Sequence, residues 1–114
     1  MRPVIMKDTI SEIEERIRNA GSLKPESRAE LLDLLGQLKS QIAALSETHQ
    51  EQAQSIAGFA EISAHEATRE EKNAKSLKFS ILGLQSSVHE LEESHPQLVG
   101  VVDRIATMLA SMGI

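Results

Sequence analysis

The chain has 114 residues, enough for one small domain that buries about two-thirds of the surface its unfolded chain exposes. It carries 12 Lys and Arg against 17 Asp and Glu, and the resulting net charge of −5 argues against sequence-independent binding to nucleic acid. There is no Cys, Trp or Tyr and there are only two Phe, which excludes disulfides, thiolate catalysis, Cys-ligated metal sites and a base-stacking surface.

The first predicted helix covers residues 9–20. Its apolar residues recur at steps of four and three, which places them on one face of a helix. Thr9 and Glu12 have the spacing of a capping box, in which a hydroxyl and a carboxylate pair with the first free backbone N–H groups. The residues of this apolar face are Met6, Ile10, Ile13, Ile17 and Ala20.

A second predicted helix covers residues 25–46. Pro25 suits its first turn, because proline has a fixed φ and lacks the N–H that would have no partner there. Leu32 and Leu34 widen the apolar face, so we expect this helix to contact more than one neighbour. The face itself consists of Leu31, Leu35, Leu38, Ile42 and Leu45.

A heptad pattern then extends over residues 53–91. A pattern of this length is typical of helices that pack along a continuous seam. Asn73 is a weak helix former within the pattern and suggests a break near it. We therefore expect two helices here, over 49–73 and 75–93.

The last predicted helix covers residues 96–112 and begins with Pro96. The residue before a proline is disfavoured in the helical region, which predicts a sharp turn between two helices. The heptad register nevertheless continues through Pro96, so a single kinked helix is the alternative. The apolar face of this helix consists of Leu98, Val102, Ile105, Leu109 and Met112.

The fold class predicted from these patterns is all-α, because no segment has the period-two alternation of a half-buried strand. We expect a single domain over residues 1–114, built as an antiparallel helical bundle or as a coiled coil with long helices. No apolar stretch suits a signal peptide or spans a bilayer comfortably. A cytoplasmic protein that binds neither membranes nor nucleic acid is therefore expected.

An apolar stripe of this length has to be covered by the chain itself, by a second copy or by a partner protein. The sequence favours a homo-oligomer, with a dimer as the first choice because two-fold symmetry is commonest, and leaves room for an unknown protein partner. The predicted oligomer seam consists of Ile56, Ala60, Ala67, Ala74, Leu77, Ile81, Leu84, Val88 and Leu91.

The densest group of metal-ligand residue types lies at 89–95. His89 and Glu93 are spaced to share a helix face, His95 follows closely, and imidazole with carboxylate groups can bind Zn²⁺. A solvated helix face with His95 near a helix cap explains the same residues without a metal. We favour this second interpretation, so no metal or cofactor is predicted and His89, Glu93 and His95 remain weak candidates.

Catalysis is not predicted either. The sequence has no nucleophile elbow and no glycine-rich phosphate loop, and adjacent carboxylates such as Glu92 and Glu93 point in different directions on a helix. The expected function is a self-associating structural or protein-interaction module without enzymatic activity. The alternative is a helical bundle that binds a metal or small ligand through His89, Glu93 and His95.

Two C-terminal segments, SVHELEESHPQL over 87–98 and RIATMLASMGI over 104–114, are the most distinctive of the chain. They resemble the end of a small bacterial family of short helical domains of unknown function, in which a Glu-x-Ser-His-Pro segment precedes a final amphipathic helix ending in Met-Gly-Ile. The segment 25–28 resembles that family more loosely. The resemblance implies a bacterial origin and a helical fold, and it implies no activity.

Overall fold

A computed structural model describes residues 6–21 and 23–112, the first three of them as backbone only. This part of the chain contains five α-helices, one 3₁₀ turn and no strand, which confirms the all-α prediction. The side chain of Met6 and the terminal Gly113-Ile114, which the sequence predictions include, lie outside the described residues. The elements are α1 (Met6–Arg18), α2 (Pro25–Leu45), α3 (Gln50–Thr68), α4 (Ala74–Ser87), the 3₁₀ turn η1 (His89–Leu91) and α5 (Pro96–Met112).

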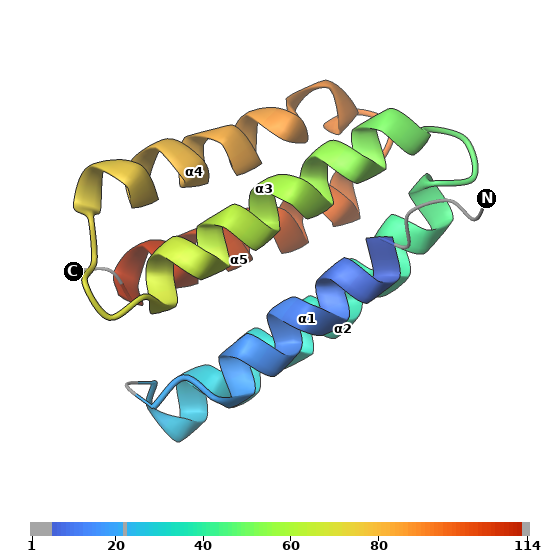
Figure 1. Cartoon of the computed structure of the whole chain (residues 1–114). Helices are drawn as coiled ribbons and strands as arrows, with labels where there is room; N and C mark the ends of the chain where they lie inside the picture. The colour runs from blue at the N-terminus through green and yellow to red at the C-terminus, as the bar shows by residue number, and fades with distance from the viewer. Residues whose placement is uncertain (1–5, 22, 113–114) are drawn as a thin grey trace.

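The helices pack as an antiparallel bundle in two layers (Figure 1). Helices α1, α3 and α4 form one layer, α2 and α5 form the other, and each helix reverses the direction of the one before it. Helix α3 is central and contacts the other four helices, whereas α4 contacts only α3, α5 and η1 within the described part. The outer side of α4 is therefore left without a covering helix.

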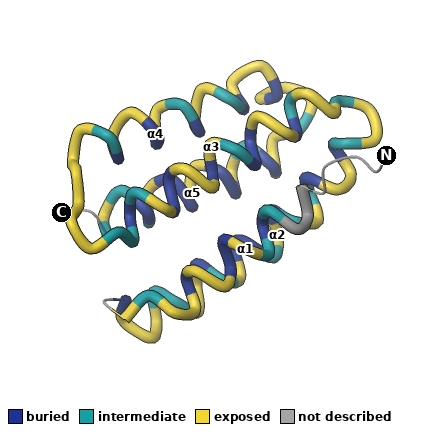
Figure 2. Tube along the Cα trace, in the orientation of Figure 1, coloured by how far each residue is buried: buried dark blue, intermediate teal, exposed yellow. Residues whose placement is uncertain are grey.

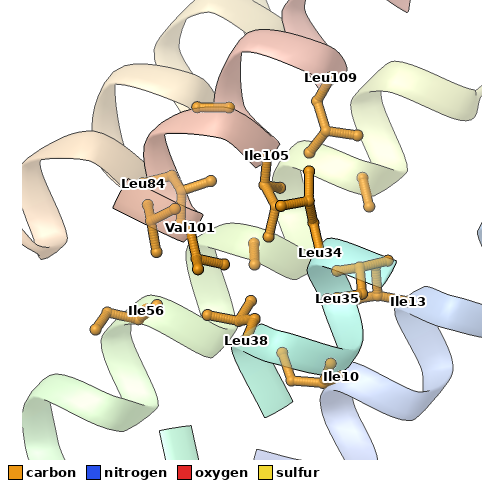
Figure 3. Close-up of a cluster of buried hydrophobic side chains, with 14 of the residues drawn as sticks. Ile10, Ile13, Leu34, Leu35, Leu38, Ile56, Leu84, Val101, Ile105 and Leu109 are labelled. Carbon is orange, nitrogen blue, oxygen red and sulfur yellow. The ribbon is translucent and has the colours of Figure 1, made fainter. Parts of the chain in front are cut away.

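The core between the layers is built from aliphatic side chains. Ile10 of α1, Leu38 of α2 and Ile105 of α5 are almost completely buried and belong to one cluster of hydrophobic side chains (Figure 3). Figure 2 shows that buried residues follow the side of each helix that faces its neighbours, as the three- and four-residue spacing predicts. Each fully buried Leu or Ile stabilises the fold by about 1.5–3 kcal/mol. Neither Phe is part of this core.

The turn between α1 and α2 is held by Arg28. Its guanidinium donates hydrogen bonds to the carbonyl oxygens of Ile17 and Leu23, both at 3.3 Å, and to the carbonyl oxygen of Ala20. Carbonyls at a helix C-terminus lack partners within the helix, so this side chain completes the end of α1. Helix α2 begins at Pro25, as predicted.

The first predicted helix differs from α1 at both ends. The pattern predicts residues 9–20, whereas α1 begins at Met6 and ends at Arg18. Thr9 therefore lies inside the helix instead of at its cap, and the predicted capping box with Glu12 is wrong. The face on which the apolar residues lie is nevertheless correct, since the described isoleucines of this stripe are all buried.

Helices α3 and α4 form a hairpin where the heptad pattern is continuous. The helix predicted over 49–73 ends earlier, at Thr68, and a short turn follows. Asn73 caps α4, because its side-chain oxygen accepts a hydrogen bond from the backbone N–H of Ser76 at 3.0 Å. The break indicated by Asn73 is thus confirmed.

The chain also turns sharply before Pro96, and this confirms the turn over the kinked helix. The helix predicted over 75–93 ends at Ser87 and is followed by η1 and a short loop. Helix α5 then covers the predicted residues 96–112 and runs back along α4 (Figure 1). Proline suits the first position of α5, since the N–H that it lacks would have no partner within the helix there.

Candidate functional site

The residues predicted as an oligomer seam line the inside of the chain. Eight of the nine are buried against the chain's own helices, and Ala74, at the first position of α4, is exposed. An interface between two copies in this conformation therefore has to use other side chains. The buried eight are Ile56, Ala60, Ala67, Leu77, Ile81, Leu84, Val88 and Leu91.

Four large hydrophobic side chains of the described residues are exposed, and they lie on two neighbouring helices. Phe59 and Ile62 are one turn apart on α3, with 37% and 50% of their surface exposed. Phe79 and Leu82 are one turn apart on α4, with 65% and 50% exposed. Helices α3 and α4 pack against each other, and we call these four exposed side chains the apolar patch.

Gly83 joins the two halves of the apolar patch. A Cβ atom at this position would lie only 2.6 Å from Cδ1 and 3.1 Å from Cζ of Phe59, well inside ordinary contact distance. The absence of a side chain at Gly83 thus lets the Phe59 ring rest directly on the backbone of α4. This contact holds the ring at the junction of the two helices.

The inner face of α3 explains why its large residues lie outside. Apart from Ile56, it consists of small side chains, which allow this central helix to approach its neighbours closely. Phe59 and Ile62 each precede one of these small residues, Ala60 and Ser63, and so project beside the packed face. The heptad pattern does not indicate this site, because neither Phe59 nor Ile62 occupies a position of the heptad seam. The available signal was that both Phe occupy positions outside the heptad seam.

An open groove of about 350 Å³ extends from the apolar patch between α3 and α4. Phe59 and Gly83 line one part of it, and the carboxylates of Glu51 and Glu90 line its far end. The opposite end of α4 carries Lys75, which is exposed and lies four residues before Phe79. This face therefore carries carboxylates at one end, apolar side chains in the middle and an exposed lysine at the other end.

The weak metal-ligand candidates do not converge. His89 lies 3.7 Å from Glu92 through its Nδ1 atom, and both side chains are largely exposed. The ring of His95 instead packs edge-on against the ring of His49, with centroids 5.7 Å apart. Over residues 6–21 and 23–112, no three His, Asp or Glu side chains are placed where they could hold a metal ion together. Glu93 is exposed.

The fold and the site define a small all-α bundle with an exposed apolar face on two of its helices. Residues 31–114 match a family described as "Domain of unknown function (DUF4404)", and the chain belongs to this family. The match includes all of α3, α4 and α5, and it confirms the resemblance to short helical domains of unknown function. No curated protein and no solved structure gives a significant match to the chain. Among the described helices, none has the length and apolar character needed to cross a membrane.

Proposed function

We propose that this chain is a protein-interaction module without catalytic activity, and that it binds another protein chain through the apolar patch. The observation that carries the proposal is the position of the two Phe side chains. They are the only Phe, Tyr or Trp residues of the chain, and both are exposed on neighbouring helices while the core is aliphatic. Aromatic side chains are enriched at the centres of protein interfaces.

The size of the apolar patch supports this function. Taking about 200 Å² for a Phe and about 175 Å² for a Leu or Ile, the four exposed fractions correspond to about 380 Å² of apolar surface. Single exposed hydrophobic residues are normal on protein surfaces, but contiguous patches of a few hundred Å² usually mark a binding site. Covering the patch would contribute up to about 9 kcal/mol before the costs of association.

The alternative function, a bundle that binds a metal or small ligand through His89, Glu93 and His95, has no comparable support. His89 faces Glu92, and His95 faces His49, so the three candidate groups do not share one centre. The groove beside the apolar patch is open and is lined by hydroxyl, amide and carboxylate groups without a histidine.

Photo-crosslinking tests the proposed function. A photoreactive phenylalanine analogue replaces Phe79 in the full chain, and a matched analogue replaces Ala44, an exposed residue of α2 on another face. We expect discrete crosslinked protein adducts in cells from position 79 and none from position 44. Leu82→Gln in the same chain should remove the adducts. Equal adducts from both positions, or none from position 79, would overturn the proposal.

A further inference from the structure

We infer that the partner of the apolar patch is a second copy of this chain, which binds face to face and antiparallel about a two-fold axis through the patch. This inference rests on the proposed function and adds the identity and the orientation of the partner. The argument comes from the order of charged and apolar side chains along the α3–α4 face.

The basic end of this face lies on the same side of α4 as the apolar patch. Lys75 precedes Phe79 by four residues and Leu82 by seven, so all three side chains share one side of the helix. Glu66 and Arg69, which end α3 nearby, neutralise each other through an ion pair of 3.0 Å. Beyond them, the turn into α4 contains Glu70, Glu71 and Lys72, and α4 carries the exposed Lys75 and Lys78 before Phe79, so this end has four positive and three negative side chains.

The acidic end of the face lies on the other side of the apolar patch. Glu51 of α3 and Glu90 of η1 stand on either side of the groove, and no Lys or Arg lines it. Lys75 lies in the first turn of α4, and Glu90 lies in η1, beyond the last turn of α4. The charges on the two sides of the apolar patch therefore have opposite signs.

This order makes the face complementary to itself. A rotation of 180° about an axis through the apolar patch places Lys75 of each copy against the acidic end of the other copy. For two copies placed face to face, this axis lies in the plane of the contact and runs across the helices. Helix α4 of one copy then faces α4 of the other, and Lys75 meets Glu90. A contact in which the same surface is used twice is the commonest form of dimer.

The size of the contact predicts a dimer of modest affinity. Two apolar patches together cover about 760 Å², which is below the lower limit of about 1,200 Å² for stable interfaces. Area alone does not set affinity, but contacts of this size commonly dissociate in the micromolar range. Since the rim charges are exposed, association should also weaken with added salt.

A charge-reversal experiment tests both the partner and its orientation. Molar mass of the purified full chain is measured by sedimentation equilibrium from micromolar to millimolar concentration. Lys75→Glu places like charges at both ends of the homodimer, and the double variant Glu51→Lys with Glu90→Lys does the same with opposite sign. Each variant alone should dissociate at least tenfold more readily than the native chain.

The decisive sample is an equimolar mixture of the two variants. In the mixed dimer every reversed carboxylate faces a reversed lysine, and the native ends also face each other, so the affinity should return to the native value. Lys24→Glu, an exposed change of equal charge at the start of α2, is the control and should leave association unchanged. Circular dichroism of each variant verifies the fold.

The outcomes separate the inference from the proposed function. A chain that stays monomeric up to millimolar concentration overturns the second copy as partner, whereas crosslinks to a different protein from position 79 would still support the proposed function. A dimer that Lys75→Glu does not weaken, or two variants that do not recover on mixing, overturns the antiparallel arrangement.

Discussion

Substituting Gly83 with Ala should lower stability, although alanine normally stabilises a helix. In an open helical position Gly→Ala gains about 1 kcal/mol. At Gly83, however, the new Cβ would lie 2.6 Å from Cδ1 of Phe59, so the ring has to move away by about 1 Å to restore contact distance. The change therefore replaces a helix-propensity gain with a loss of packing.

The magnitude follows from the exposure of Phe59. The side chain is 37% exposed, so it buries about 125 Å² of an area of about 200 Å². If the displaced ring loses half of this contact, the cost is about 1.5 kcal/mol, which leaves a net loss of about 0.5 kcal/mol. Gly36→Ala is the matched control, because a Cβ there meets no atom within 4 Å and should stabilise the chain by about 1 kcal/mol.

Urea denaturation followed by circular dichroism measures both variants, and the two should differ by about 1.5 kcal/mol. A second pair isolates the ring: in a Phe59→Ala background, Gly83→Ala should become stabilising, since nothing remains for the Cβ to displace. If Gly83→Ala stabilises the otherwise native chain as much as Gly36→Ala does, Phe59 does not rest on α4 and the apolar patch is not built as described.

Three further variants test the bundle by the same denaturation measurement. Glu14→Gln should cost about 1–2 kcal/mol, because Glu14 is largely buried and accepts a hydrogen bond from Lys39 at 2.8 Å, joining α1 to α2. Ser63→Ala should stabilise by about 1 kcal/mol, because its buried Oγ has no hydrogen-bond partner among the described residues. Ile81→Asp with Leu84→Asp should unfold the chain, because both side chains are buried in its core.

Each of these predictions would be contradicted by the opposite result. A neutral Glu14→Gln would mean that the ion pair adds nothing to α1–α2 packing, and a destabilising Ser63→Ala would mean that the hydroxyl has a partner. Retention of both helicity and monomer mass by the Ile81 and Leu84 double variant would contradict the placement of α4 in the bundle.

The inward face of each helix was predictable from the sequence. The repeats of Ile and Leu at three- and four-residue steps identify the buried sides of α1, α2 and α5, because a helix returns to the same side at that period. The distinctive segment around Pro96 also indicated the family of short helical domains and the turn before the last helix. Periodicity reports which side of a helix is covered and does not report what covers it.

The hairpin of α3 and α4 shows the limit of this reasoning. The heptad register continues through Glu70 and Ala74 although the helix breaks there. The reason is that the buried residues of α3 and those of α4 fall on the same seven-residue spacing. The pattern therefore favoured an intermolecular seam where the chain covers its own residues. The contact of His49 with His95 joins two loops that are distant in sequence, and no local pattern predicts it.

The central claim is that both Phe rings lie on an exposed patch that association covers. Because the chain has only two Phe residues, fluorine NMR of the 4-fluorophenylalanine-labelled protein reports on this patch alone. At micromolar concentration both resonances should show the solvent isotope shift of exposed rings, and the shift should diminish toward millimolar concentration as the patch is covered. Resonances without an isotope shift at the lowest concentration would show rings buried within the chain and would contradict the account.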